Sequence, residues 1–511
     1  MAAAKTIQLD GENLTFAQLY DVSLGGAHVA LAPAAAKRMR VSRSVVERVV
    51  ASGATAYGVN TGFGELAEVR ISSDQIRQLQ LNLVRSHCCG VGALLSETEV
   101  RAMMVLRANA LAKGFSGVRT IVVETLCEML NRAVRPVVPS QGSVGASGDL
   151  APLAHLASVA IGEGEAIYDG ARVSGAEAMK RAGIAPLALE AKEGLSLLNG
   201  TQGMLALLSL AIRDAQIICD TADVAAALSL DALRGSPAAF DARIAAARPH
   251  AGAALTARNL VRLNAGSKIR ESHRAAEKDP RVQDAYSLRC TPQVHGAARD
   301  SVAQVSAVAA IELNSATDNP LVFAGAKGAG EIISGGNFHG QPLAMAADQL
   351  AVAFATLGGI SERRISYMTN PQTSLLPAFL TRNPGLNSGF MIAQVAAAAL
   401  ASELKTLSTP HSVDSIPTSG DQEDYVSMGM SAARRLGPMI ANLQRIIAIE
   451  LLAACQGIDL LAPLRTGKEA QRAFDLVRSV VPTLEADRPL APDIGAVVNL
   501  VQDGGFLKLL G

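Results

Sequence analysis

Residues 140–155 have the sequence SQGSVGASGDLAPLAH, in which three glycines at a spacing of three are followed by an abrupt return to apolar residues. Glycines free the backbone for a tight turn, and the apolar run after Asp149 predicts a helix. A phosphate-binding loop would place Lys and then Ser or Thr after its last glycine, and a nucleophile elbow would place Gly two residues after Ser147. The sequence has Asp149-Leu150 instead. A plain turn before a helix and an unusual chemistry are the interpretations that remain.

The unusual chemistry is a reaction of the backbone itself at Ala146-Ser147-Gly148. In a sufficiently tight turn, the amide nitrogen of Gly148 can attack the carbonyl carbon of Ala146. Ring closure with loss of water, and loss of the Ser147 hydroxyl as a second water, would leave a five-membered imidazolone with an exocyclic alkene. The residue types suit this reaction, because Ala146 is small and Gly148 has no side chain to obstruct its nitrogen.

This stretch resembles the signature of the aromatic amino acid ammonia-lyases, and the resemblance extends from about Leu14 to about Asp493. It implies the prosthetic group 4-methylidene-imidazol-5-one (MIO), formed autocatalytically from Ala146, Ser147 and Gly148, with no external cofactor. It also implies an aromatic amino acid as substrate. A noncatalytic helical assembly protein is the alternative from another class, and its intact mass would equal that of the unmodified chain.

The composition favours a protein that acts on small molecules or assembles with other proteins. The 511 residues are 49% hydrophobic, and 46 basic residues balance 46 acidic ones, so no charge excess attracts nucleic acid or an anionic membrane. The N-terminus lacks the apolar core of a secretory signal. The longest uncharged stretch, residues 383–402, contains Pro384 and Gly385 and favours a loop that leads into a buried helix. The six cysteines have no paired spacing, which predicts no metal site and a reduced, cytoplasmic protein.

Long Ala- and Leu-rich patterns predict a mainly α fold, with a long-helix bundle core and small peripheral β pieces. Helices are expected over residues 203–230, 300–314, 341–365, 390–407 and 431–461, the last with a kink or break at Pro438. Strands are expected over residues 7–9, 166–169 and 331–334. We expect one integrated catalytic unit. Its N-terminal region, residues 1–200, contains the MIO loop and the base, and its long-helix region, residues 201–511, contains substrate-binding and oligomerisation segments.

Residues 54–64, ATAYGVNTGFG, place Tyr57 among three glycines. Locally, this tyrosine is most simply a loop aromatic that packs on a neighbour. The matching tyrosine of the family is the base that removes a β-proton, so the resemblance makes Tyr57 the candidate base. A free phenol has a pKa of about 10, so such a base needs assistance from its surroundings.

Two further positions have structural explanations on local grounds and bind substrate by resemblance. His87 follows Ser86 and matches a position that lies against the substrate ring. Ser-His is usual there in histidine-specific members of the family, although some bacterial tyrosine-specific members are similar. Asn199 is locally a cap or turn residue, and its family counterpart contacts the MIO carbonyl region and the substrate.

Gln283, Tyr286 and Arg289 follow one another at a spacing of three, which on a helix would place them on roughly one face. A surface stripe is the simpler alternative. By resemblance, Arg289 binds the substrate carboxylate, Tyr286 supports the MIO group and Gln283 belongs to the substrate-binding shell. An arginine can hold a carboxylate through two parallel hydrogen bonds.

Phe338 lies in the loop sequence GGNFHG, residues 335–340, and matches a residue that packs near the MIO group. Core packing explains this phenylalanine equally well on local grounds. The run Glu362-Arg363-Arg364 predicts a structural ion pair.

The segment SGDQEDY, residues 419–425, bears most directly on the substrate. Acidic loops are usually solvated, but Gln-Glu-Asp at this place is typical of the histidine-specific members, in which Glu423 would meet the substrate ring. A carboxylate can accept a hydrogen bond from an imidazole N–H or pair with imidazolium, and it gains nothing from a phenyl ring. Gly420, Asp421 and Tyr425 depart from the usual Ala, Asn and His. The sequence therefore indicates the identity of the substrate less directly than it indicates the reaction class.

Together these residues predict the non-oxidative elimination of ammonia from L-histidine to trans-urocanate, in which Tyr57 removes the β-proton and the MIO group is the electron sink. A tyrosine or phenylalanine ammonia-lyase, or an MIO-dependent aminomutase, is the alternative. Helices that are apolar all round favour an oligomeric bundle, and the resemblance implies a homotetramer whose sites are shared among three subunits.

Overall fold

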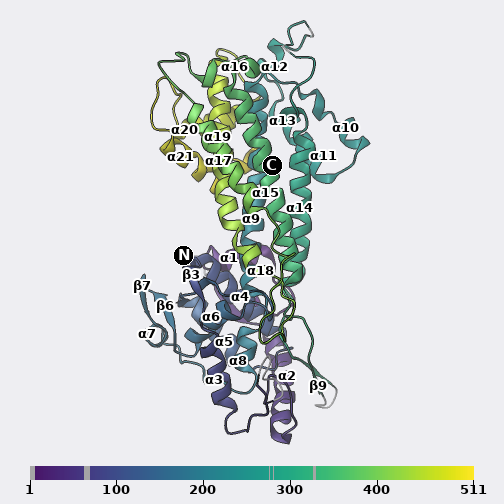
Figure 1. Ribbon diagram of the computed structural model, residues 1–511, viewed down its shortest axis with the longest axis vertical. Helices are drawn as coiled ribbons and strands as arrows, with labels where there is room; N and C mark the ends of the chain where they lie inside the picture. Colours follow the sequence, from purple (N-terminus) through teal and green to yellow (C-terminus); the bar gives the residue numbers. More distant parts are fainter. Residues whose placement is uncertain (1–5, 63–68, 276, 280, 326–329, 511) are drawn as a thin grey trace. The chain divides into compact units, whose positions relative to one another are not determined.

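A computed structural model describes residues 6–62, 69–275, 277–279, 281–325 and 330–510 (Figure 1). The described chain is mainly helical with short strands, which confirms the predicted fold class. It divides into two compact units. Unit 1 comprises residues 1–210, 306–348 and 410–434, and unit 2 comprises residues 211–305, 349–409 and 435–511. Both units consist of three separate chain segments, whereas the two regions expected from the sequence, residues 1–200 and 201–511, are each continuous.

Unit 1 contains helices of moderate length and four small sheets. Its helices are α1 Phe16–Ser23, α2 Pro33–Ser52, α3 Ile76–His87, α4 Glu97–Ala112, α5 Thr120–Asn131, α6 Leu150–Ala160, α7 Gly175–Arg181, α8 Glu193–Leu198 and α18 Gly429–Arg434. Its strands are β1 Ile7–Leu9, β2 Val29–Leu31, β3 Val91–Leu94, β4 Arg135–Pro136, β5 Pro139–Gln141, β6 Glu165–Tyr168, β7 Ala171–Ser174, β8 Leu321–Ala324 and β9 Gly330–Ile333. Strands β1 and β2 pair in parallel, and the pairs β3–β5, β4–β6, β6–β7 and β8–β9 are antiparallel. The three predicted strands are confirmed to within one residue as β1, β6 and β9.

Three long helices each contain one of the chain boundaries between the units. They are α9 Gln202–Ala232, α14 Thr291–Glu312 and α15 Gln341–Thr369. The predictions for α9 and α15 are confirmed within a few residues, but α14 begins nine residues before the predicted start at Asp300. Its second residue is Pro292, and proline is well suited to the first turn of a helix because its missing N–H would have no intrahelical partner there.

Unit 2 contains the remaining helices. They are η2 Pro237–Phe240, α10 Ala242–Ala247, α11 Ala251–Leu263, α12 Lys268–Ser272, α13 Tyr286–Arg289, α16 Pro371–Ser374, η4 Ala378–Leu380, α17 Met391–Leu407, α19 Leu436–Leu460, α20 Lys468–Val480, α21 Ala491–Gln502 and η5 Leu507–Leu509. The break predicted within residues 431–461 falls at Arg435, between α18 and α19. Pro438 lies in the first turn of α19, where a proline removes no intrahelical hydrogen bond.

Three helical segments are long and apolar enough to cross a membrane, judged by length and composition alone. They are Gln202–Ala232, Gln341–Thr369 and Gly429–Leu460, the last taken across α18 and α19. In the structure 78%, 67% and 83% of their most apolar windows are buried. Residues 383–402, predicted as a loop that leads into a buried helix, do form a loop followed by α17. This helix is only partly buried. Ile392 and Val395 on this helix are 63% and 52% exposed.

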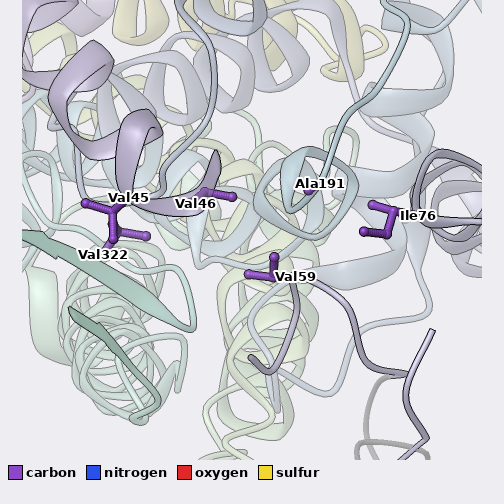
Figure 2. Close-up of a cluster of buried hydrophobic side chains, with 6 residues drawn as sticks. All are labelled: Val45, Val46, Val59, Ile76, Ala191 and Val322. Atoms are coloured by element: carbon purple, nitrogen blue, oxygen red, sulfur yellow. The ribbon is translucent and has the colours of Figure 1, made fainter. Parts of the chain in front are cut away.

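A small apolar cluster in unit 1 anchors the loop that contains Tyr57. The cluster joins α2, the Tyr57 loop, the start of α3, the segment before α8, and β8 (Figure 2). Its buried members are Val45, Val46, Val59, Ile76, Ala191 and Val322. Val59 lies two residues after Tyr57 and is fully buried, and burying a valine side chain stabilises a fold by about 1.5–3 kcal/mol. The cluster therefore fixes the backbone next to the candidate base.

Candidate active site

The loop between β5 and α6 is a tight turn that depends on glycine. Gly145 and Gly148 have φ of +71° and +73°, a region that other residues rarely adopt. A Cβ on Gly148 would overlap the carbonyl oxygen of Gly200, because these two residues form a bridge and the amide of Asp149 donates to the same oxygen over 2.8 Å. Chain segments distant in sequence therefore hold Ala146-Ser147-Gly148 in a bent conformation.

Ser143 and Asp149 tie the two ends of this loop together. The Ser143 hydroxyl lies 3.2 Å from the carbonyl oxygen of Gly148 and 3.1 Å from Asp149 Oδ1, and can donate to either oxygen. Asp149 Oδ2 accepts from the amide of Met204 in α9 over 2.8 Å. Burial raises the pKa of Asp149 to about 7, although these donors favour the ionised form. Asp149 is thus a buried acid that fixes the turn.

Glu423 lies against Ser147. The Ser147 hydroxyl donates to Glu423 Oε1 over 3.1 Å, and the Thr418 hydroxyl donates to Oε2 over 2.9 Å. Thr418 and Glu423 also exchange two backbone hydrogen bonds of 3.0 and 3.2 Å, which close a short turn. The turn orients the carboxylate, so Oε1 meets the Ala146-Ser147-Gly148 loop.

The departures from the family pattern at residues 420 and 421 lie at the tip of this turn. Ser419, Gly420 and Asp421 have φ of +55°, +62° and +64°, so three consecutive residues are left-handed. Asp421 is exposed and is not among the residues that line the cavity described below. Tyr425 does line the cavity, and its ring stacks on that of His339 at a centroid distance of 6.3 Å.

His87 is the last residue of α3 and faces the same space. Its Nδ1 donates to the carbonyl oxygen of Leu83 over 2.8 Å, since a carbonyl can only accept, and this leaves Nε2 as the acceptor of the neutral ring. Burial lowers the pKa of His87, while the Leu83 carbonyl and the Glu423 carboxylate oppose that shift. A neutral imidazole with a fixed tautomer is the result.

Tyr57 sits in a turn that its neighbour Asn60 stabilises. Asn60 Oδ1 accepts from the amide of Ala56 over 2.8 Å, and Nδ2 donates to the carbonyl oxygen of Ala54 over 2.9 Å. Gly58 has φ of +73°, and a Cβ there would press on Leu195 and Pro320. The turn presents the Tyr57 side chain to the cavity. Phe63 and Gly64, the last residues of the quoted motif, lie outside the described residues.

A cavity of about 790 Å³ within unit 1 brings most of the predicted site residues together. Its lining includes Tyr57, His87, Ala146, Ser147, Asn199, Phe338 and Glu423. Asn199 directly follows α8 as its C-cap, and Phe338 lies in the loop between β9 and α15. Gly148, next to Ser147, is buried and is not among the lining residues. A groove of about 980 Å³ occurs in unit 2, but its lining includes none of the predicted site residues.

Gln283, Tyr286 and Arg289 belong to unit 2 and do not line this cavity within the described chain. The prediction that they share a helical face is wrong for Gln283, because α13 begins only at Tyr286. Tyr286 and Arg289 do lie together, with the guanidinium carbon 4.6 Å from the ring centre. Tyr286 is 70% exposed.

The predicted ion pair at Glu362-Arg363-Arg364 is present, and a second pair lies beside it. Arg363 pairs with Glu362, whereas Arg364 pairs with Glu450 of α19, and both members of the second pair are completely buried. Arg364 Nη1 also lies 3.3 Å from the carbonyl oxygen of Ser287, to which it donates, in α13. The pair therefore supports the helix that contains Tyr286 and Arg289.

Comparison with known proteins identifies the family. A family model described as aromatic amino acid lyase matches residues 14–479. The chain is 55% identical over 510 residues to a histidine ammonia-lyase of Koribacter versatilis, an alignment that covers 98% of each sequence. The chain belongs to the aromatic amino acid lyase family.

Two solved structures of related proteins share this fold. The histidine ammonia-lyase from Trypanosoma cruzi has a TM-score of 0.91 and 44% identity, with 99% of this chain and 95% of that chain covered. The tyrosine aminomutase from Streptomyces globisporus has a TM-score of 0.93 and 40% identity, with 99% and 98% covered. Proteins with two different reactions thus have the fold of this lyase-family chain.

Several residues around the site of this aromatic amino acid lyase were not identified from the sequence. Asp149 stood in the quoted motif, and its place before a helix, where acidic residues are common, was the available signal. Thr418 lies five residues before Glu423 and had no comparable signal. Lys192 and Asp318, which are described further below, look like ordinary surface residues in the sequence.

Proposed function

We propose that the protein is a histidine ammonia-lyase, which eliminates ammonia from L-histidine to form trans-urocanate. The observation that supports this most strongly is Glu423, whose Oε1 lies 3.1 Å from the Ser147 hydroxyl in the cavity that also contains the neutral His87. A carboxylate at this position can bind an imidazole N–H, and a phenyl ring would leave it without a donor. The curated relative that is 55% identical has this activity in its name.

We assign the MIO group to Ala146-Ser147-Gly148, and the surrounding residues fit it. The turn is tight, Gly148 has no room for a side chain, and Ser143 and Asp149 hold the ends of the loop. Loss of the Ser147 hydroxyl would leave Glu423 Oε1 available for a substrate donor. The group would supply the electrophile that departure of an α-ammonium requires.

The side chains of unit 1 then have distinct tasks. Tyr57 is the base for the β-proton, and the Asn60 turn with the buried Val59 fixes its position. Glu423 and His87 bind the imidazole ring, His87 through an Nε2 that is oriented by its Nδ1 contact with Leu83. Phe338 lines the same cavity, and we assign it to packing near the MIO group.

The remaining three residues act on the site of a neighbouring subunit in this proposal. Arg289 binds the α-carboxylate, Tyr286 supports the MIO group and Gln283 completes the binding shell. Among the described residues that line the cavity, none is Lys or Arg, so a substrate carboxylate needs a cation from outside this lining, and we assign that role to Arg289 of another chain. Exposed apolar side chains on α14, α15 and α17 suit such an assembly, a homotetramer; they include Ile311, Met345, Val352 and Ile392, each at least 50% exposed.

The first experiment incubates the purified protein with L-histidine, L-tyrosine and L-phenylalanine, and follows ultraviolet absorbance for the conjugated acid of each. Urocanate from histidine alone is expected. Coumarate or cinnamate would overturn the substrate assignment. Intact mass tests the MIO group: the protein should be lighter than its sequence by two water molecules, and the Ser147→Ala variant should show no such loss.

Replacement of Glu423 by Gln tests the imidazole contact. Loss of a charge-assisted hydrogen bond is expected to lower kcat/KM for L-histidine about 10- to 100-fold. Asp421→Asn is the matched control, because this neighbouring acid is exposed and outside the cavity lining, and it should leave kcat/KM within about twofold. Equal effects of the two substitutions would contradict a specific contact of Glu423.

An aminomutase is the second candidate, favoured by the 40% identity with the Streptomyces globisporus enzyme. Such an enzyme would return ammonia to the β-carbon. Proton NMR of the reaction mixture distinguishes the two activities, since only an aminomutase accumulates a β-amino acid.

A further inference from the structure

A completely buried ion pair lies behind the cavity of unit 1. Lys192 Nζ lies 2.8 Å from Asp318 Oδ2, and the two side chains are 0% and 2% exposed. The Ser196 hydroxyl donates to the same oxygen over 2.8 Å, and Lys192 Nζ also lies 3.0 Å from the Ser196 oxygen. Burial lowers the pKa of Lys192, and the Asp318 carboxylate opposes that shift. Buried ion pairs contribute little net stability, so their presence calls for another explanation.

The second oxygen of Asp318 contacts a cavity residue. Asp318 Oδ1 accepts from the amide of Asn319 over 2.7 Å and from Asn199 Nδ2 over 3.3 Å. Asn199 Nδ2 also donates to the carbonyl oxygen of Asn319 over 3.0 Å. A carboxylate and a carbonyl can only accept, so both contacts require the NH₂ group of Asn199 on this side. The orientation of the amide is thereby fixed.

The oxygen atom of the same amide receives no hydrogen bond from the described residues. Asn199 is 3% exposed and lines the cavity, and its Oδ1 is buried without a hydrogen-bond partner among the described residues. An unsatisfied buried acceptor is unfavourable unless a ligand supplies the donor. The α-ammonium group of an amino acid is such a donor.

We propose that Lys192 and Asp318 are positioning residues that hold the Asn199 amide with Oδ1 toward the substrate, where it accepts a hydrogen bond from the α-ammonium. The inference rests on the proposed function, in that the ligand is an amino acid. Asp318 connects the ion pair to Asn199. Lys192 and Ser196 donate to its Oδ2, and the side-chain amide of Asn199 donates to its Oδ1. Neither Lys192 nor Asp318 lines the cavity.

Asp318→Asn changes the polarity of this arrangement while keeping its shape. Lys192 and Ser196 both require an acceptor, so the oxygen of the new amide faces them and its NH₂ group faces Asn199. The Asn199 NH₂ group then meets a donor at this position and keeps only the carbonyl oxygen of Asn319 as its acceptor, so the amide is no longer held in one orientation. An ammonium group loses part of its hydrogen bond to Oδ1, whereas a ligand without the amino group is indifferent.

The test measures binding in the Ser147→Ala background, in which the elimination cannot occur. Titration calorimetry compares L-histidine with 3-(imidazol-4-yl)propionate, which has the same ring and carboxylate and no amino group. Asp318→Asn is expected to weaken the binding of L-histidine about tenfold and to leave the affinity for the deamino ligand within about twofold of its original value. Equal weakening of both ligands, or no change in either, would overturn the proposal.

Three further variants separate positioning from a general loss of structure. Ser196→Ala removes one donor to Asp318 with little change in volume, and a smaller selective loss of L-histidine affinity is expected. Glu312→Gln is the control, since this half-buried acid of unit 1 accepts from Thr201 and, within the described chain, forms no hydrogen bond with Asn199. It should leave both affinities unchanged. In an Asn199→Ala background, Asp318→Asn should have no further selective effect, and a retained effect would contradict action through Asn199.

A failure of the proposed function can be distinguished from a failure of the positioning role. If the parent protein converts L-tyrosine and not L-histidine, the same titrations are made with L-tyrosine and 3-(4-hydroxyphenyl)propionate. Selective loss of the amino-bearing ligand then supports the positioning role with a different substrate, and its absence contradicts that role.

Discussion

Asp149 fixes the turn at Ser147, but ionisation of its buried carboxyl group destabilises the folded protein. Its pKa in the folded protein is about 7, against 3.8 for the free side chain, chiefly because it is buried. Between these two values the unfolded chain is ionised while the folded chain retains its proton. The folded state therefore binds more protons, and stability falls as pH rises through this window.

Asp149→Asn removes this titration. The stability of the variant relative to the wild type is expected to rise between pH 4 and pH 7 by up to about 4 kcal/mol and to level off above pH 7. The oxygen of the Asn side chain can accept from the Met204 amide while its NH₂ group faces the Ser143 hydroxyl, which can accept as well as donate, so any remaining difference does not depend on pH. Calorimetric unfolding of both proteins at several pH values measures the difference. Parallel pH profiles would show that the acid is not buried in this way.

Arg364 and Glu450 act at the scale of an element, because they support the short helix α13. Both side chains are fully buried, and Glu450 also accepts from the hydroxyls of Ser229 and Ser361. Arg364 donates to the Ser287 carbonyl, which lies inside α13. A four-residue helix has little intrinsic stability, so external contacts of this kind hold Tyr286 and Arg289.

Arg364→Met is expected to destabilise the protein by about 3–5 kcal/mol, because Glu450 is left buried without its counter-charge. The double variant Arg364→Met, Glu450→Gln should recover much of this loss, since a glutamine oxygen can still accept from the serines. Urea unfolding followed by circular dichroism provides the comparison. No recovery in the double variant would indicate that packing, and not the uncompensated charge, is responsible.

The sequence was informative about elements with regular patterns and about residues in a motif. Apolar periodicity located α9 and α15 within a few residues, and the glycine spacing located the turn at Ser147. The start of α14 was missed because the residues before Asp300 include His295 and Gly296, which weaken the apolar pattern. Gln283 was placed on a helix because spacing alone does not show where a short helix begins.

Contacts between distant segments were beyond the reach of the sequence. Lys192 and Asp318 are 126 residues apart, and nothing in either neighbourhood distinguishes a buried charge from a solvated one. Glu423 was singled out as a candidate from the sequence, but its contact with Ser147 spans 276 residues and depends on the turn that Thr418 closes. Such pairings arise from the tertiary fold and leave no local pattern.

At the scale of the whole molecule, the predicted site residues fall into two groups. Tyr57, His87 and Glu423 line one cavity of unit 1, whereas Tyr286 and Arg289 belong to unit 2 and lie outside its lining. The proposed homotetramer joins them by combining unit 1 of one subunit with residues of another. The exposed Tyr286 and the exposed apolar side chains of α17 agree with this assembly.

Mixed oligomers test whether two subunits share a site. Tyr57→Phe and Arg289→Met are each expected to abolish most activity when present in every subunit. If Tyr57 and Arg289 of one site come from different subunits, random assembly of the two variants leaves about a quarter of the sites with both native residues. Coexpression with two different tags, purification of the hybrids and a turnover assay should therefore recover about a quarter of the wild-type activity.

A mixture of Tyr57→Phe with His87→Ala is the matched control. Both residues line the same cavity within one chain, so each chain of this mixture lacks one of them and no hybrid contains an intact site. Recovery in the first mixture and none in the second is the pattern that a shared site produces. Absence of recovery in both mixtures would mean that Arg289 acts within its own chain, and the assignment of Arg289 to a neighbouring subunit would be wrong.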